Sequence, residues 1–163
     1  MASRDIDKLG RRLGNAQLPS ADDLGQLATL QDEYQAASRP IGLALAELVD
    51  RWNVDNPRAP IAINSRAKTY GTLIEKVRRG TRLSTMQHVI GFRISATSNP
   101  GDFFLSDQDA VTADIVGRWA GVRITDRRAI PSSGYRAVHA VVEVDGVPAE
   151  IQIRTHLQDV WAN

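Results

Sequence analysis

The sequence predicts an α/β domain with a mixed β-sheet of about four to five strands, helices on at least one face and a polar cleft on the other. Residues 134–155 carry the pattern of a β-hairpin, residues 86–96 form the most apolar run, and apolar side chains recur at helical spacing before and between them. With 163 residues, of which 42% are hydrophobic and 24% charged, the chain suits one domain over residues 1–163 with a sizeable core.

Composition narrows the class of protein. No apolar run approaches the roughly 20 residues that span a bilayer, and the N-terminal segment has no hydrophobic signal, so we expect no membrane association and a cytoplasmic location. The lack of cysteine excludes disulfides and thiolate metal sites. A formal net charge of +1 is too small for a general nucleic-acid binder.

The predicted hairpin turns at Asp145-Gly146, because this dipeptide accommodates the positive φ angles of a type I′ turn. A two-residue loop sets the register of the strands, so Val144 should face Val147. Further from the turn, the predicted pairs are Val141 with Glu150, His139 with Gln152 and Ala137 with Arg154.

Alternation of side chains along the two strands sorts the hairpin into two faces. The core face carries Val138, Ala140, Val142, Val144, Val147, Ala149, Ile151 and Ile153, and the other face carries Tyr135, His139, Glu150, Gln152 and Arg154. The polar face is either ordinary solvated surface or a site, because its acid, base, amide, imidazole and phenol can together bind a nucleotide or metal and move a proton. Gly134 would let a ligand or another backbone approach closely.

The first third of the chain is expected to pack against the rest and to carry no chemistry. Residues 1–19 are polar and contain two glycines and a proline, which predicts a flexible lead-in or a weak helix. Residues 20–53 form a helical packing segment that opens with a capping box at Ser20 and is interrupted at Pro40. Residues 53–63 are typical of a linker or a short extended piece.

Residues 65–80 predict a helix with one strongly basic side. The basic side carries Lys68, Thr72, Lys76 and Arg79, with Arg66 close to the helix N-terminus. Such a stripe is either a solvated charged face or a phosphate site, since a helix N-terminus and lysine ammonium groups both favour anions.

The remaining segments complete the predicted order of elements. After the strand at 86–96, a capping pattern at 106–109 opens a helix, residues 121–125 form a short strand, residues 126–133 form a loop with two arginines, and a last helix begins at His156.

Four motifs, in sequence order, resemble the synthetase domain of the RelA/SpoT family of alarmone synthetases: SRAKTYGTLIEKVRR, HVIGFRI, GYRAVH and EIQIRTHLQDVWA. The resemblance implies a nucleotidyltransferase-like synthetase fold and a nucleotide-binding core over residues 64–163 that is truncated at its C-terminal end. It also implies transfer of pyrophosphate from ATP to the 3′-hydroxyl of GDP or GTP, with Mg²⁺ as the cofactor.

The resemblance assigns roles to individual residues. ATP would be bound by Arg66, Lys68, Lys76, Arg79 and Arg93, and the guanine nucleotide by Tyr135, His139, Gln152 and Arg154. Arg66 and Arg93 resemble the pair that stacks on adenine, and Tyr135 the residue that stacks on guanine. Glu150 takes the place of the catalytic glutamate, near Mg²⁺ and the attacking hydroxyl. Strict alternation would turn Arg93 away from position 88 unless Gly91 allows a bulge.

Two departures from the family pattern bear on catalysis. His88 stands where the family has a metal-binding aspartate, and imidazole is a poor ligand for Mg²⁺, which prefers oxygen. The acceptor loop lacks the lysine that normally follows the proline at 131, which Arg127 or Arg128 could replace. Pyrophosphate transfer depends on metal neutralisation of phosphate charge. The sequence therefore predicts a domain that binds both nucleotides, binds Mg²⁺ weakly or not at all, and transfers pyrophosphate poorly or not at all.

Three alternatives stay open. The chain could be an active small synthetase that recruits its metal through Glu150 and water. It could pyrophosphorylate the 3′ end of tRNA, and the candidate docking residues are Arg11, Arg12, Arg127 and Arg128. It could also be a non-catalytic interaction domain, for instance one that pairs with a full-length synthetase homologue. A monomer and a small homo-oligomer are both compatible with the sequence.

Overall fold

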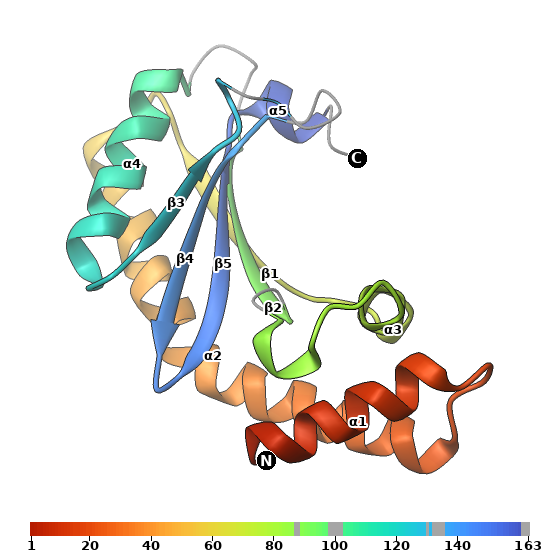
Figure 1. The fold of residues 1–163 in the computed structure, drawn as a ribbon. Coiled ribbons are helices and arrows are strands. Elements are labelled where there is room, and N and C mark those ends of the chain that lie inside the picture. Colours follow the sequence, from red (N-terminus) through yellow and green to blue (C-terminus); the bar gives the residue numbers. More distant parts are fainter. Residues whose placement is uncertain (87–88, 98–102, 130, 132–135, 161–163) are drawn as a thin grey trace.

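A five-stranded mixed β-sheet with the strand order β1-β2-β5-β4-β3 forms the centre of the computed structural model (Figure 1). The structure describes residues 1–86, 89–97, 103–129, 131 and 136–160. The strands are β1 (Ile61–Ala67), β2 (Ile90–Ala96), β3 (Arg123–Asp126), β4 (Val138–Val144) and β5 (Val147–Arg154). β2 and β5 pair in parallel, and every other pair of neighbours is antiparallel. The predicted fold class is therefore confirmed.

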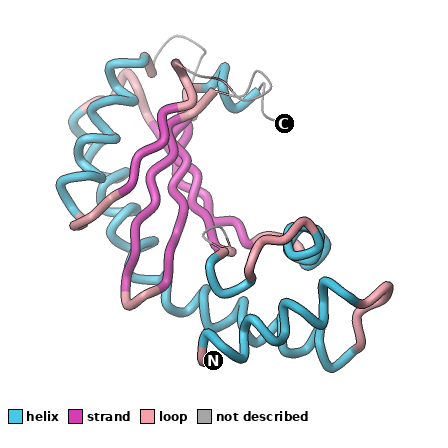
Figure 2. Tube along the Cα trace, viewed as in Figure 1, coloured by secondary structure: helices cyan, strands magenta, loops and turns pink. Residues whose placement is uncertain are grey.

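Helices cover one face of this sheet and stand at the two ends of the other (Figures 1 and 2). They are α1 (Ser3–Asn15), α2 (Ala21–Asp55), α3 (Tyr70–Arg78), the 3₁₀ turn η1 (Leu83–Thr85), α4 (Leu105–Arg118) and α5 (His156–Val160). α2 and α4 pack on the apolar face, whereas α3 and α5 lie at opposite ends of the concave polar face.

The hairpin has the predicted turn and register. Asp145 and Gly146 both have positive φ angles, 52° and 77°, as a type I′ turn requires. Val144 pairs with Val147, and the ladder runs outward from there. It ends at Val138 and Ile153, one step short of the predicted Ala137–Arg154 pair.

One hydrophobic cluster, which we call the sheet cluster, lies between the apolar face of the sheet and the helices α2 and α4. Its buried members include Ile41, Leu45 and Leu48 from α2, Val111 and Ile115 from α4, and Ile94, Val138, Ala140, Val142, Ala149, Ile151 and Ile153 from the sheet. The alternation predicted for the hairpin is confirmed for the six core-face side chains farthest from the turn, which are at most 1% exposed. The other two, Val144 and Val147 beside the turn, are half-buried.

A second cluster, the helical cluster, corrects the prediction of a flexible lead-in at residues 1–19. Helix α1 buries Ile6, Leu9 and Leu13 against α3, η1 and the first half of α2. The two glycines that argued against a helix are instead contact points. A Cβ added at Gly10 would lie 3.0 Å from the Cβ of Leu83, and one at Gly14 would lie 3.1 Å from a methyl of Val77.

Helix α2 runs through Pro40 without the predicted interruption. A proline inside a helix costs about 3 kcal/mol, because it removes a hydrogen bond and crowds the preceding turn. Leu30 lies in the helical cluster before Pro40, and Ile41 and Leu45 lie in the sheet cluster after it. Burial on both sides of the proline offsets its local cost.

The segment expected to be one helix over residues 65–80 is a strand followed by a helix. β1 extends through Ala67 and pairs with β2 over its whole length. α3 begins only at Tyr70, where the hydroxyl of Thr69 accepts the backbone N–H of Thr72. The start of β1 is held on α2 by Asn53, whose side-chain amide donates to the carbonyl of Ile61 and accepts its N–H. Arg66 therefore belongs to the sheet.

Candidate functional site

The polar face of the sheet aligns the predicted site residues in two lateral rows. In one row Arg66 pairs with Gly91 and Gly91 with Glu150. In the next row Arg93 pairs with Gln152, which pairs in turn with His139. Cross-strand partners point to the same face of a sheet. The pairing of β2 with both neighbours is continuous, so Arg93 reaches this face without the bulge that we considered at Gly91.

A cleft of about 170 Å³ lies on this face. Its lining residues come from β1, the link from β1 to α3, the first turn of α3, β2 and β5: Arg66, Lys68, Thr72, Gly91, Phe92, Arg93, Glu150 and Gln152. The backbone of Lys68 is held from both sides, because its N–H donates to the carbonyl of Val89 (3.0 Å) and its carbonyl accepts from the side chain of Gln31 on α2 (2.5 Å). The cleft therefore forms where α3 meets the sheet.

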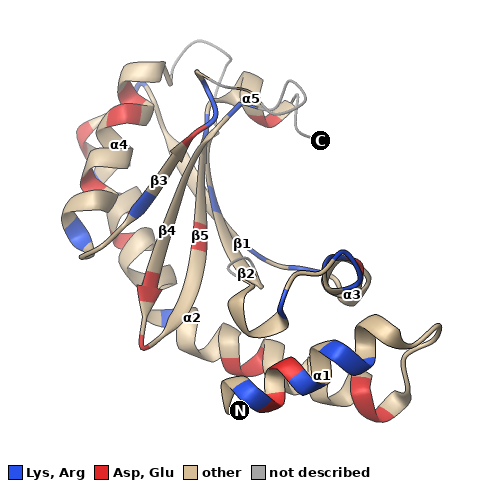
Figure 3. Ribbon diagram, in the orientation of Figure 1, with Lys and Arg blue, Asp and Glu red and all other residues tan. Residues whose placement is uncertain are grey.

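Positive charge dominates the cleft. Figure 3 shows basic residues on β1, β2 and α3 around the concave face, with an acidic position in the middle of β5. Burial lowers the pKa of Lys68 below its ordinary value of 10.5, and the charges of Lys76 and Arg66 add to this effect, whereas Glu150 opposes it. Within the described part of the chain, neither Arg66 nor Lys68 forms an ion pair within 4.0 Å. Such a set of cations favours a polyanionic ligand.

Glu150 lies in a chain of hydrogen bonds across the site. One carboxylate oxygen lies 2.7 Å from Nδ1 of His139, and the other accepts the side-chain amide of Gln152 at 3.0 Å. The amide oxygen of Gln152 accepts Nη2 of Arg154 at 2.7 Å. Arg154 also contacts the carboxylate of Asp159 at 3.1 Å, and the same oxygen of Asp159 lies 3.3 Å from Arg93.

Several predicted site residues lie outside this cleft. Arg154 is only 4% exposed, does not line the cleft and contacts Gln152 and Asp159. Arg79 is exposed and pairs with Glu75 on the same helix. Lys76 is half-buried and acts on Lys68 through charge, but it does not line the cleft. The sequence reasoning missed Asp159, for which the only signal was a carboxylate inside the EIQIRTHLQDVWA motif.

Two assignments made from the motifs lie outside the described residues. These are His88, at the position of the family's metal-binding aspartate, and Tyr135, with the neighbouring Gly134. Their predicted roles stay predictions.

The arginines considered for the acceptor loop and for tRNA are in different environments. Arg128 forms ion pairs with Asp126 and Asp109, which together raise the pKa of its guanidinium. Arg12 is paired with Asp23. Arg11 and Arg127 have no ion pair with any described residue, but α1 and the loop after β3 lie at opposite ends of the molecule (Figure 1). These four residues therefore form no continuous basic surface.

Mg²⁺ is the cofactor that the family implies. The described residues contain no group of three His, Cys, Asp or Glu side chains placed to hold a metal ion. Among the described residues, Glu150 is the one carboxylate that lines the cleft, and both of its oxygens already have polar partners. Since Mg²⁺ is usually held by one or two carboxylates together with substrate phosphates, the described residues do not form a complete magnesium site.

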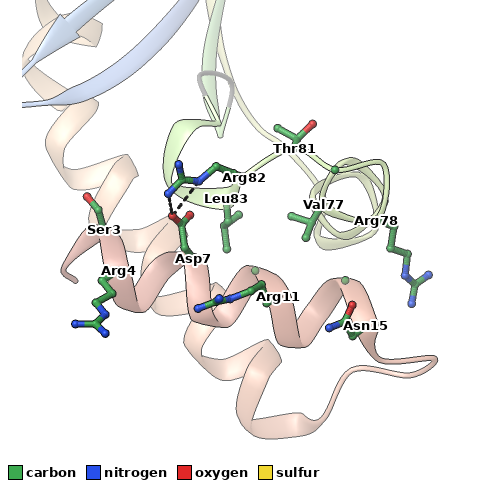
Figure 4. Close-up of a pocket in the computed structure, with 13 residues that line it drawn as sticks. Ser3, Arg4, Asp7, Arg11, Asn15, Val77, Arg78, Thr81, Arg82 and Leu83 are labelled. Atoms are coloured by element: carbon green, nitrogen blue, oxygen red, sulfur yellow. Dashed lines mark hydrogen bonds and ion pairs between the residues drawn. The ribbon is translucent and has the colours of Figure 1, made fainter.

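A larger cavity, of about 670 Å³, lies between α1 and the segment from α3 to η1 (Figure 4). Two of the four arginines that line it hold these elements together. Arg82 pairs with Asp7, and Arg78 donates to the carbonyls of Ala16 and Gln17 just after α1. Figure 4 shows Arg4 and Arg78 directed away from each other, so charge does not converge on one point. We therefore place the candidate site in the smaller cleft.

Fold and site together define a RelA/SpoT-type synthetase domain. Residues 65–163 match the family described as the region found in RelA / SpoT proteins, and the chain belongs to that family. The small alarmone synthetase 1 from Bacillus subtilis bound to its product pppGpp is similar in structure, with a TM-score of 0.70 and 28% identity over 85% of this chain and 78% of that chain. Small alarmone synthetase 2 from the same organism is similar with a TM-score of 0.63 and 25% identity, over 83% and 75% of the two chains.

Curated relatives are found in mycobacteria. The uncharacterized proteins Rv1366 of Mycobacterium tuberculosis and Mb1401 of Mycobacterium bovis are each 38% identical to this chain over 127 residues, or 72% of its length. The chain spans only 43% of the length of these relatives. None of the described helices has the apolar length that a bilayer crossing requires.

Proposed function

We propose that this domain binds ATP and a guanine nucleotide, GDP or GTP, in the cleft between α3 and the sheet, and that its transfer of pyrophosphate between them is weak or lost. The observation that carries the proposal is the convergence of Arg66, Lys68 and Arg93 with Glu150 in one cleft. Three cations facing one carboxylate suit a polyphosphate, since a lysine whose pKa is lowered by burial and neighbouring cations is stabilised when phosphate binds.

The ATP side is assigned to β1, β2 and the start of α3. Lys68 supplies a point charge to the phosphates, and the guanidinium groups of Arg66 and Arg93 can stack on a purine base as well as pair with phosphate. The similarity to a synthetase structure bound to pppGpp supports a guanine nucleotide as the second ligand.

Glu150 is the candidate general base for the attacking hydroxyl. Each carboxylate oxygen has two lone pairs, so a substrate hydroxyl can donate to Glu150 while Gln152 and His139 remain in place. Weak transfer is proposed because position 88 carries histidine, so the anionic ligand that would hold Mg²⁺ beside the phosphates is missing.

Binding and turnover test the two halves of the proposal separately. Calorimetric titration with ATP, GDP and GTP should give saturable binding. Incubation of labelled ATP with GDP or GTP should give little or no labelled product, and His88→Asp should increase it. Saturable binding by the unaltered chain with rapid, magnesium-dependent transfer would contradict the proposed loss of activity, whereas no binding would contradict the nucleotide site itself.

A matched pair of substitutions tests the cleft. Lys68→Met removes one charge from the cleft, and Arg51→Gln removes one from an exposed position on α2. We expect Lys68→Met to weaken ATP binding by about ten- to a hundredfold, as the loss of one desolvated charge contact does, and Arg51→Gln to leave it unchanged. Equal effects of both substitutions would show that the affinity for ATP depends only on the overall charge of the protein.

A further inference from the structure

Asp159 links Arg93, which lines the cleft, to Arg154, which does not, through a single carboxylate oxygen. This oxygen lies 3.1 Å from Nη1 of Arg154 and 3.3 Å from Nη1 of Arg93. The side chain of Asp159 is 27% exposed, and those of Arg93 and Arg154 are 23% and 5% exposed. α5, which carries Asp159, follows β5 after one residue and packs against β2 and β5. Asp159 therefore bridges the two parallel strands that carry the site.

Arg154 fixes the orientation of the Gln152 side chain and, through it, that of the Glu150 carboxylate. A guanidinium can only donate hydrogen bonds, so the side chain of Gln152 must turn its oxygen toward Arg154 and its NH₂ group toward Glu150. The second oxygen of Glu150 then faces Nδ1 of His139. The direction of the whole chain is thus set at the arginine, and the arginine is oriented by Asp159.

The same carboxylate also restrains the guanidinium of Arg93. A carboxylate that pairs with the edge of a guanidinium lies near its plane and restrains its rotation. Pairing at the edge leaves the flat faces of a guanidinium, which are the surfaces that stack on a base, uncovered by the carboxylate itself. Arg93 lines the cleft, so Asp159 would hold this stacking surface in place before the nucleotide arrives.

We infer that Asp159 is a positioning residue for both nucleotides: it orients Arg93 on the ATP side and, through Arg154 and Gln152, the Glu150 carboxylate on the acceptor side. This inference rests on the proposed function of the cleft. The residue that determines how both nucleotides are positioned is then one that touches neither of them, and it lies on α5, a helix of five residues after the last strand.

The test measures the affinities for ATP and for GDP separately, by calorimetry in the presence of Mg²⁺. We expect Asp159→Asn to weaken binding of each nucleotide by about tenfold. This is the lower end of the loss that is typical when a residue that orients a ligand-binding side chain is removed. Leu157→Ala, at a 56% exposed position on the same helix, is the control and should leave both affinities unchanged.

Double-mutant cycles separate positioning from a general loss of structure. In the Arg93→Gln background, Asp159→Asn should cost no further ATP affinity. In the Gln152→Leu background, it should cost no further GDP affinity. A residue that only stabilised the fold would give the same loss in every background, and such additive losses would overturn the inference.

Other outcomes are equally informative. Unchanged affinities in Asp159→Asn would overturn the inference, and so would tighter binding, because Asp159 would then compete with the phosphates for the arginines. If circular dichroism shows that Asp159→Asn does not fold, the cycles are run with Asp159→Glu, which keeps the charge and moves it by one methylene, with the same non-additivity expected and additivity overturning the inference. No binding by the unaltered chain would contradict the proposed function, a result distinguishable from all of these.

Discussion

The sheet cluster and the helical cluster are built in different ways, although α2 contributes to both. The sheet cluster packs mostly β-branched side chains from the four strands β1, β2, β5 and β4 against the helices α2 and α4. The helical cluster packs short helices, which approach closely at Gly10 and Gly14. The candidate site lies between them, since β2 and β5 present Arg93 and Glu150, while the link from β1 to α3 presents Lys68 and the first turn of α3 presents Thr72.

The charged side chains of the cleft are therefore positioned by two separate hydrophobic clusters. α3 is anchored in the helical cluster by Leu73 and Ile74, which are 1% and 8% exposed. Its position relative to Glu150 therefore depends on how α1 packs beneath it. The following predictions test the two clusters, the hairpin and the cleft, from the largest expected effect to the smallest.

Truncation of one fully buried side chain in each cluster should have the largest effect. Ile153 in the sheet cluster and Leu9 in the helical cluster are both 0% exposed. We expect Ile153→Ala and Leu9→Ala each to lower the free energy of unfolding by about 2–5 kcal/mol, through lost burial and the cavity left behind. Urea denaturation measures this loss.

The same variants test whether the two clusters unfold together. Trp52 and Trp119 report on the sheet cluster by fluorescence, and far-ultraviolet circular dichroism reports on all helices. Because α2 spans both clusters, the two probes should give coincident transitions. Separate transitions in Leu9→Ala would show that the helical cluster unfolds independently.

Gly10→Ala should destabilise the contact of α1 with η1. The new Cβ would meet the Cβ of Leu83 at 3.0 Å, so α1 must shift, and we expect a loss of about 1–3 kcal/mol in urea denaturation. Gly25→Ala on α2 is the control, since nothing lies within 4 Å of its added Cβ. It should gain about 0.5–1 kcal/mol from helix propensity. A gain in both variants would mean that α1 does not pack as described.

Gly146→Ala should destabilise the hairpin by about 1–2 kcal/mol, the cost of a left-handed backbone for a residue with a Cβ. Gly146 has a φ angle of 77° and open space around it, so the cost comes from the backbone and not from a clash. Gly117→Ala, in helix α4 and also in open space, is the control and should be neutral or stabilising. Thermal unfolding of both variants measures the difference.

Lys68→Met should have the smallest effect on stability, and that effect should depend on pH. Burial lowers the folded-state pKa of Lys68 below 10.5, so the unfolded chain binds the proton more readily. The charged lysine therefore destabilises the fold at neutral pH, and this penalty disappears as pH rises toward 10.5. The gain in unfolding free energy on Lys68→Met should be largest near neutral pH and shrink with increasing pH. A gain independent of pH would contradict the described environment.

The hairpin was predictable because its determinants are local. Asp145 and Gly146 set the turn, a two-residue loop sets the register, and alternation then sorts every side chain. The grouping of Glu150, Gln152 and His139 on one face follows from these facts alone. Of the candidate site, this part could be derived without any knowledge of the other strands.

The N-terminal half was harder to predict because distant contacts outweigh local preferences there. The glycines of α1 lower its helix propensity, yet they allow close contacts with Leu83 and Val77. Pro40 disfavours a continuous helix, yet both halves of α2 are buried. The end of β1, residues 65–67, was mistaken for the start of a helix, because its pairing partner β2 lies more than twenty residues away in the sequence.

By itself, the sequence determined the family, the mixed sheet with its hairpin, and the side chains that carry charge on the polar face. Only the tertiary structure decided that Arg66 lies on a strand, that Arg154 is buried and that Asp159 bridges two arginines. The physical reason is the range of the interactions. Turn geometry and alternation act between neighbours in the chain, whereas burial and ion pairing depend on which distant segments the fold brings together.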